Sequence, residues 1–183
     1  AGHNDFGFSK GNGLSGHDSH GFTNLDRFAG RQISTVTLLT DTPGGQTAHH
    51  RANVDRSHIA STDGSCRHII DFGVRFDNEI LYDDEFKRLA EICPQFHYRV
   101  SMSRKMQNAD GSRKYVQHLL LDYAAETFPL LQQARTRMYV CGLKGMESGI
   151  AESLRAMASA HQTDPEAFVT AVTAKDRYCE EVY

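Results

Sequence analysis

The pattern of hydrophobic and polar positions changes near residue 32. Before it, apolar residues such as Phe6, Phe8 and Leu14 are isolated among Gly, Ser, Asn, Asp and His, and they keep no sustained period. After it, runs typical of strands alternate with stretches at helical spacing. We therefore predict an extended, Gly-rich N-terminal arm over residues 1–31 and one folded domain over residues 32–183.

The folded part reads as an α/β domain. β-Branched and aromatic residues predict strands over residues 32–40, 68–74, 96–102 and 137–141. Helical spacing and capping predict helices over residues 81–91, 115–128, 147–160 and 165–174, the last one capped by Asp164, and residues 46–57 are interpreted as a short polar helix. This alternation predicts a Rossmann-like parallel sheet of about five strands with helices on both faces. Ligands of such sheets bind beyond the carboxyl ends of the strands.

Length and charge narrow the class of protein. The chain has 183 residues, 20.5 kDa and a formal net charge of −3, which indicates one domain and excludes a basic nucleic-acid-binding surface. No apolar run is long enough to span a bilayer, so we do not expect a transmembrane protein. The start at Ala1 indicates either that a targeting segment was removed or that the chain was trimmed. With the first explanation we expect an intracellular protein of a plastid or mitochondrion, and otherwise one of the cytoplasm.

Two features of the arm resemble functional motifs but do not predict a function. The histidines of 17–20 (HDSH) could be drawn as a metal site, but a Gly-rich arm offers no rigid support for ligands, so no metal is expected. Residues 11–16 match GxGxxG, yet neither a strand before nor a helix after them is predicted, so we interpret the match as chance.

The four widely spaced cysteines favour reduced thiols over a disulfide framework.

Two loops at predicted strand ends carry candidate chemistry. Residues 101–105 (SMSRK) and 112–115 (SRKY) combine hydroxyls, cations and an aromatic ring, which suit an adenosine bearing a phosphate. A solvated basic surface loop is the alternative. Residues 141–147 (CGLKGME) follow a strand and precede a helix, where glycines allow a ligand to approach the backbone. A turn needed only for packing is the alternative there.

Taken together, these segments resemble the C-terminal NADP-binding domain of the plant-type ferredoxin–NADP reductase family. Four blocks in family order carry the resemblance: Phe72-Gly73-Val74 with residues 79–86, Ser103-Arg104 with Tyr115-Val116-Gln117, residues 138–147, and the terminal Glu181-Val182-Tyr183. The resemblance covers roughly residues 68–183. It implies a role in binding NADP(H).

The resemblance also implies roles for matching residues. Ser103, Arg104 and Arg113 would hold the 2′-phosphate, and Tyr115 would stack on adenine beside Gln117. The residues that would line the nicotinamide side are Gly142, Leu143 and Gly145. Those that would stand near hydride transfer are Cys141 and Glu181, with Tyr183 covering a flavin ring.

The sequence departs from the family in two ways. Residues 1–67 contain neither of the family's flavin-binding segments, so FAD is not expected in this chain. Residues 36–45 stand where the family has a strand followed by a Gly-rich pyrophosphate loop. With that alignment Asp41 and Pro43 replace two glycines, which would add a repulsive charge and remove an N–H donor. An unrelated turn is the alternative.

Three functions follow from these departures. The first is a reductase-derived domain serving as an accessory or structural subunit of a larger organellar or electron-transfer complex, docked on protein subunits through its arm. The second is the NADP(H)-binding half of a ferredoxin- or flavin-linked oxidoreductase whose FAD domain is on another chain. The third is a fragment of a full reductase. None of them predicts reductase activity of this chain alone.

Overall fold

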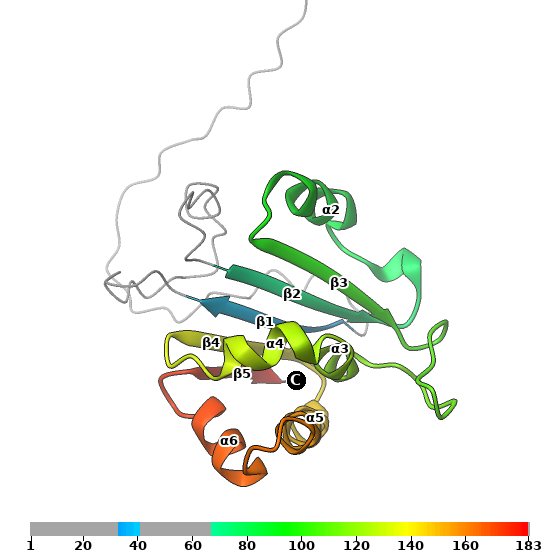
Figure 1. The fold of residues 1–183 in the computed structure, drawn as a ribbon. Coiled ribbons are helices and arrows are strands. Elements are labelled where there is room, and N and C mark those ends of the chain that lie inside the picture. Colours follow the sequence, from blue (N-terminus) through cyan, green and yellow to red (C-terminus); the bar gives the residue numbers. More distant parts are fainter. Residues whose placement is uncertain (1–32, 41–66, 183) are drawn as a thin grey trace, which may run out of the picture.

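The computed structural model describes residues 33–40 and 67–182, and it contains strands and helices in alternation (Figure 1). The described strands are β1 (Ser34–Thr40), β2 (Arg67–Val74), β3 (Phe96–Met102), β4 (Thr136–Gly142) and β5 (Tyr178–Val182). The described helices are the short 3-10 helix η2 (Asp77–Glu79) and the α-helices α2 (Asp83–Ile92), α3 (Val116–Asp122), α4 (Ala124–Leu131), α5 (Met146–Ala160) and α6 (Pro165–Val172). The predicted α/β class with a five-stranded sheet is confirmed. The predicted N-terminal arm and the helix predicted over residues 46–57 lie outside the described residues.

The strand order is β3-β2-β1-β4-β5, and the central strand runs against the other four. β2 pairs with β3, and β4 with β5, in parallel. β1 is antiparallel to both of its neighbours, with Ser34 opposite Gly73 and Thr40 opposite Arg67. The prediction that all strands are parallel is therefore wrong for β1. Its alternation of buried residues, Val36 and Leu38, fits the sheet equally well in either direction, so the pattern does not specify the direction.

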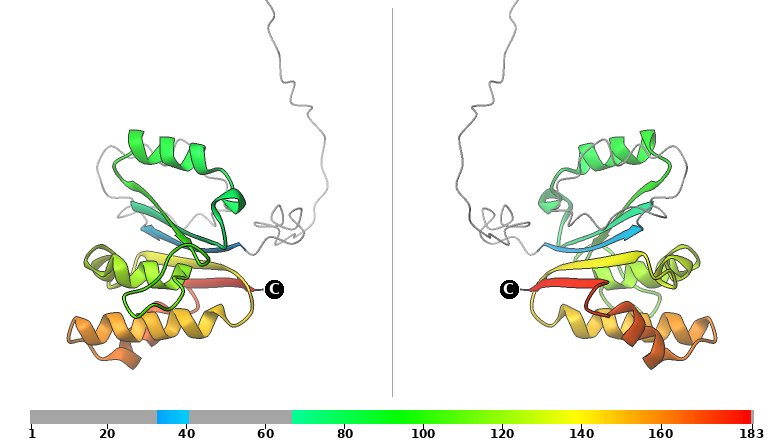
Figure 2. Two further views of the ribbon diagram at one scale, coloured as in Figure 1. Left: turned by 90° about the vertical axis from the view of Figure 1, so that its right-hand side faces the viewer. Right: turned by 90° about the vertical axis from the view of Figure 1, so that its left-hand side faces the viewer.

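Helices cover both faces of the sheet, as predicted. Figure 2 shows α2 on one side and α3, α4, α5 and α6 on the other. The main core lies between the sheet and this second group, and its most buried side chains include Leu38, Ile69, Leu120, Met138 and Leu154. α2 packs only over β2 and β3, through Phe86, Tyr98 and their apolar neighbours. None of the described helices is both long and apolar enough to cross a bilayer.

One predicted helix is interrupted. The helix expected over residues 115–128 is two helices, α3 and α4, which meet at Tyr123. The hydroxyl of Thr127 donates to the backbone oxygens of Leu120 and Tyr123, each at 3.0 Å. A buried side-chain donor thus satisfies carbonyl groups at the junction, which allows the backbone to turn there.

Candidate functional site

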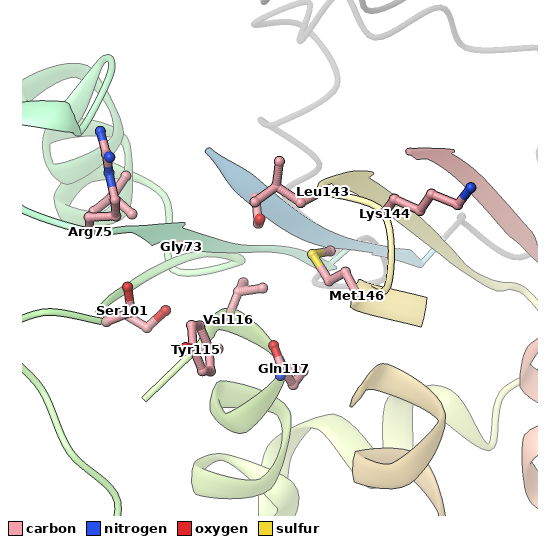
Figure 3. A pocket seen from close by; sticks show the side chains of 12 residues that line it. Gly73, Arg75, Ser101, Tyr115, Val116, Gln117, Leu143, Lys144 and Met146 are labelled. Atoms are coloured by element: carbon pink, nitrogen blue, oxygen red, sulfur yellow. The ribbon is translucent and has the colours of Figure 1, made fainter. Parts of the chain in front are cut away.

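A cavity of about 200 Å³ opens where β2, β3 and β4 end and β1 begins. It lies between the start of α3 and the loop that joins β4 to α5 (Figure 3). Its lining residues are Ser34, Gly73, Val74, Arg75, Ser101, Ser103, Tyr115, Val116, Gln117, Leu143, Lys144 and Met146. Hydroxyls, cations and an aromatic ring therefore surround an apolar floor at the predicted edge of the sheet.

The floor of the cavity requires a glycine. A Cβ atom at Gly73 would lie 2.8 Å from Cβ of Val116, which is closer than real Cβ contacts allow. Val116 is 2% exposed and fixed in the core, so it has no room to move away. The glycine therefore lets the side chain of Val116, at the start of α3, pack directly against β2 at the floor of the cavity.

Three of the five residues expected to bind the adenosine phosphate line the cavity. Ser103 is buried and Tyr115 is 44% exposed. Gln117 follows Tyr115 by two residues, in the first turn of α3. Arg104 and Arg113 are exposed and lie outside the lining, on the loop between β3 and α3. The structure thus gathers Ser103, Tyr115 and Gln117 directly and places the two arginines on the segment that connects them.

Backbone contacts hold this loop in place. The N–H groups of Ser103 and Arg104 donate to the carbonyls of Val74 and Arg75 at 2.9 and 3.1 Å. The N–H of Tyr115 donates to Nδ1 of His118 at 2.9 Å. Burial lowers the pKa of His118, which favours the neutral ring that can accept this bond. The ring of Tyr115 therefore stands at a defined place beside the cavity.

The loop from β4 to α5 supplies the opposite wall. Leu143 lines the cavity together with Lys144 and Met146, whereas Gly142 and Gly145 flank it. Gly145 precedes α5 with φ 92°, a left-handed conformation that favours glycine. A Cβ at Gly142 would lie 2.7 Å from Oγ of Ser34, so this glycine lets β1 and the loop meet.

The residues expected near hydride transfer lie apart from the cavity. Cys141 of β4 pairs in register with Glu181 of β5, so the structure brings these two together. Cys141 is buried and Glu181 is exposed. Val140 packs in the core beneath α5, and side chains alternate along a strand, so Cys141 points to the opposite face. Tyr183 lies outside the described residues.

Cationic groups stand at the rim of the cavity. The guanidinium of Arg75 is held by Glu79, with Nε 2.9 Å from Oε1, and this contact raises the pKa of Arg75 and lowers that of Glu79. Nζ of Lys105, which lies outside the lining, is 2.8 Å from Asp77. Lys144 is exposed at the other end. Because the charge of Arg75 is offset by Glu79, Lys144 is the lining residue whose positive charge favours an anion.

The expected pyrophosphate loop does not follow a strand end at this cavity. Thr40, the last residue of β1, pairs with Arg67 and with Thr136, which are the first residues of β2 and β4. The carboxyl end of β1 therefore lies at the edge of the sheet opposite the cavity. Asp41 and Pro43 are outside the described residues. The antiparallel direction of β1 does not support the alignment of residues 36–45 with the family's strand and loop, and this alignment stays a prediction because residues 41–45 are not described.

Sequence reasoning missed several lining residues. Ser34 lies inside β1 and Arg75 directly follows β2, so neither belongs to a segment that the sequence singled out for ligand binding. Ser101, Val116 and Met146 lie within the predicted segments, but no role was assigned to them. The sequence contained only a weak signal for Ser34 and Ser101: each is a serine near an end of its strand, and each pairs in register with Gly73.

Metal and disulfide chemistry find no support in the described part of the chain. No group of His, Cys, Asp and Glu there could hold a metal ion, and the histidines of residues 17–20 lie outside it. Cys93 and Cys141 are buried, Cys179 is exposed, and no disulfide joins these three.

Comparison with known proteins places this geometry in a family. The model of the oxidoreductase NAD-binding domain matches residues 43–152. A ferredoxin–NADP reductase of Synechocystis sp. is 36% identical over 113 residues, which are 61% of this chain and 27% of that protein. The leaf-type chloroplastic ferredoxin–NADP reductase of Nicotiana tabacum is 40% identical over 87 residues, 47% of this chain and 24% of that protein. A ferredoxin–NADP reductase of Spirulina sp. is 34% identical over 113 residues, 61% of this chain and 38% of that protein. The matched region thus spans about a quarter to two fifths of these relatives.

Proposed function

This chain belongs to the oxidoreductase NAD-binding domain family and corresponds to the C-terminal NADP-binding domain of ferredoxin–NADP reductases, and from that premise we propose that it binds NADP(H) in the cavity described above. One observation carries the proposal. Ser103, Tyr115 and Gln117 on one wall and Leu143 on the other line a single cavity, although they are far apart in the sequence. A dinucleotide needs such a pair of walls, because its adenosine and nicotinamide ends bind at separate places.

We propose a division of roles along this cavity. The hydroxyl of Ser103, with the exposed guanidinium groups of Arg104 and Arg113 on the same loop, binds the 2′-phosphate. The half-exposed ring of Tyr115 stacks on adenine, and Gln117 lies beside it. Gly142, Leu143 and Gly145 contact the nicotinamide side.

We propose that this domain works within a larger assembly. A flavin, when bound, supplies the redox chemistry of reductases of this kind, and we propose that it comes from outside residues 32–183. For Cys141 and Glu181, paired in register on β4 and β5, to contact the reacting nicotinamide, with Tyr183 next to them, the nicotinamide ring must extend beyond the cavity. The phenylalanines of residues 1–31 would contact a protein subunit. The chloroplastic relative from tobacco supports a plastid location.

A second candidate role is that of an accessory or structural subunit. The reversed central strand favours it, because the segment after β1 leaves the sheet at the edge away from the cavity. The assembled complex separates the two roles. NADPH-dependent diaphorase activity that is lost on Glu181→Ala supports the oxidoreductase. Absence of any NADP-dependent absorbance change supports the accessory role.

Calorimetric titration of the full chain with NADPH and NADH tests the proposed binding. We expect NADPH to bind more tightly, and the double variant Arg104→Ala/Arg113→Ala to lose about 10- to 100-fold in NADPH affinity with little change for NADH. Arg88→Ala is the control, since Arg88 is exposed on α2, on the other face of the sheet. Equal affinities for the two dinucleotides, or an equal loss in the control, would contradict the assignment.

A further inference from the structure

We infer that the diphosphate of the bound dinucleotide lies on two serine hydroxyls, those of Ser34 and Ser101, on either side of Gly73. This inference rests on the proposed NADP(H) binding and assigns a part of the ligand that no loop motif of this chain accounts for. It makes Ser34 and Ser101 ligand-binding residues of the cavity.

The sheet itself builds this pair of hydroxyls. Ser34 of β1 is in register with Gly73 of β2, and Gly73 is in register with Ser101 of β3. The three residues therefore form one row across neighbouring strands, and all three line the cavity. Side chains of residues in register point to the same face. Two hydroxyls thus flank a position that has no side chain of its own and against which Val116 packs.

Ser101 has an unused hydroxyl. The residue is fully buried, and its Oγ has no hydrogen-bond partner among the described residues. Other buried hydroxyls are satisfied: Oγ1 of Thr136 is 2.6 Å from the Leu130 carbonyl, and that of Thr127 donates to Leu120. A buried hydroxyl without a partner is costly, so its presence in a ligand cavity indicates that a ligand acceptor completes it. Figure 3 shows Ser101 at the opening that Gly73 and Val116 also border.

The positions of the two serines select the diphosphate rather than another part of the ligand. Ser101 is two residues before Ser103, at the adenosine wall. Ser34 lies against the loop of the nicotinamide wall, because a Cβ at Gly142 would meet its Oγ at 2.7 Å. The group that joins the two halves of a dinucleotide is its diphosphate. That group must therefore cross the cavity between these hydroxyls, past the side chain of Val116 that covers Gly73.

The surroundings suit a doubly charged anion. α5 begins at Met146, which lines the cavity, so the positive end of the helix dipole faces it. Lys144 stands at the rim. Because β1 is antiparallel, its first residues rather than its last ones lie at the cavity. Ser34, the first residue of the strand, therefore takes the role that a loop after the carboxyl end of a parallel strand would have. The reversed strand and the serine row thus belong to one arrangement.

Two ligands separate this inference from the proposed function. NADP⁺ carries the 2′-phosphate and the diphosphate, whereas 2′-AMP carries only the 2′-phosphate and adenine. In calorimetric titrations of the full chain, we expect Ser34→Ala and Ser101→Ala each to weaken NADP⁺ about tenfold and to leave 2′-AMP unchanged. Ser159→Ala, an exposed serine at the far end of α5, is the matched control and should change neither affinity.

Stability of the ligand-free protein gives a second readout. Ser101→Ala removes an unsatisfied buried hydroxyl, so its melting temperature without ligand should stay equal or rise while NADP⁺ affinity falls. A purely structural role would lower both. Retention of NADP⁺ affinity within twofold in both variants, or equal losses for NADP⁺ and 2′-AMP, overturns the inference and leaves the proposed function intact. A wild-type chain that binds neither ligand overturns both.

Discussion

Asp71 and Arg99 form a buried ion pair next to the cavity, and the protonation of Asp71 should affect stability. The carboxylate is fully buried, and its oxygens lie 2.6 and 3.0 Å from Nε and Nη2 of Arg99. Burial raises the pKa of Asp71 from 3.8 to about 6, against the lowering effect of Arg99. Between pH 3.8 and about pH 6, the carboxyl group of Asp71 is protonated in the native state and ionised in the unfolded state. This residue therefore stabilises the fold progressively as the pH falls from about 6 to about 4.

Urea unfolding of the wild type and of Asp71→Asn between pH 4 and pH 7.5 measures this effect. We expect the free energy of unfolding of the wild type, relative to the variant, to rise on the order of 1–3 kcal/mol on acidification through that window. The double variant Asp71→Asn/Arg99→Gln serves as a second reference, because the single variant leaves Arg99 with only the more distant Glu126, 3.6 Å away, as an acidic partner. A difference that is constant with pH, or that falls on acidification, would contradict the raised pKa.

At the scale of elements, Arg177 ties the last strand to its neighbours. Its guanidinium donates to the carbonyls of Thr136, Ala171, Leu131 and Gln133 at 2.7–3.1 Å. These groups belong to β4, α6, the end of α4 and the turn that follows it, and burial lowers the pKa of the guanidinium. One side chain therefore satisfies carbonyls from three elements immediately before β5 begins.

We expect Arg177→Ala to lower the free energy of unfolding by about 2–4 kcal/mol, because carbonyl groups lose a charged donor. Arg177→Lys should retain part of this, since lysine lacks the planar fork. The control is Arg155→Ala, which breaks the exposed pair with Glu166 and should cost below about 1 kcal/mol. Equal effects of the two alanine substitutions in urea unfolding would exclude the tying role of Arg177.

The strands and helices show how much of the fold could be predicted from the sequence. β3 occupies the predicted residues 96–102, because its apolar and polar residues alternate between bounding turn signals. β5 was not predicted: its residues are mostly exposed and polar, and parallel pairing with β4 forms the strand. The break at Tyr123 was not predicted either, since neither Gly nor Pro marks it and the hydroxyl of Thr127, a tertiary contact, stabilises it.

At the scale of the whole molecule, sequence and topology contribute different parts of the site. Ser103, Tyr115, Gln117 and Leu143 could be predicted because their motifs are local and resemble a family. The row that contains Ser34 and Ser101 could not be predicted, because it exists only when β1 lies between β2 and β4 in a particular direction and register. The direction of a strand depends on how its connections leave the sheet. The alternation of apolar and polar residues along the strand does not encode this direction.

The direction of β1 can be tested by cross-linking. Thr40 lies opposite Thr136 with their Oγ1 atoms 3.1 Å apart, so Thr40→Cys/Thr136→Cys should form a disulfide on mild oxidation. A parallel β1 would instead bring its amino end toward Thr136, so Ser34→Cys/Thr136→Cys is the matched control and should not cross-link. Both pairs are made in a Cys66→Ser background, because Arg67, the residue after Cys66, pairs with Thr40.

Peptide mapping by mass spectrometry identifies the linked residues in each variant. A disulfide between positions 40 and 136 alone supports the antiparallel strand, and with it the approach of Ser34 to the cavity. A disulfide between positions 34 and 136 alone would reverse β1 and move Ser34 to the far edge of the sheet. The serine row would then not exist, and residues 41–45 would follow a strand end at the cavity, where the pyrophosphate loop of the family was first expected. One cross-linking result thus decides between two ways of binding the same diphosphate.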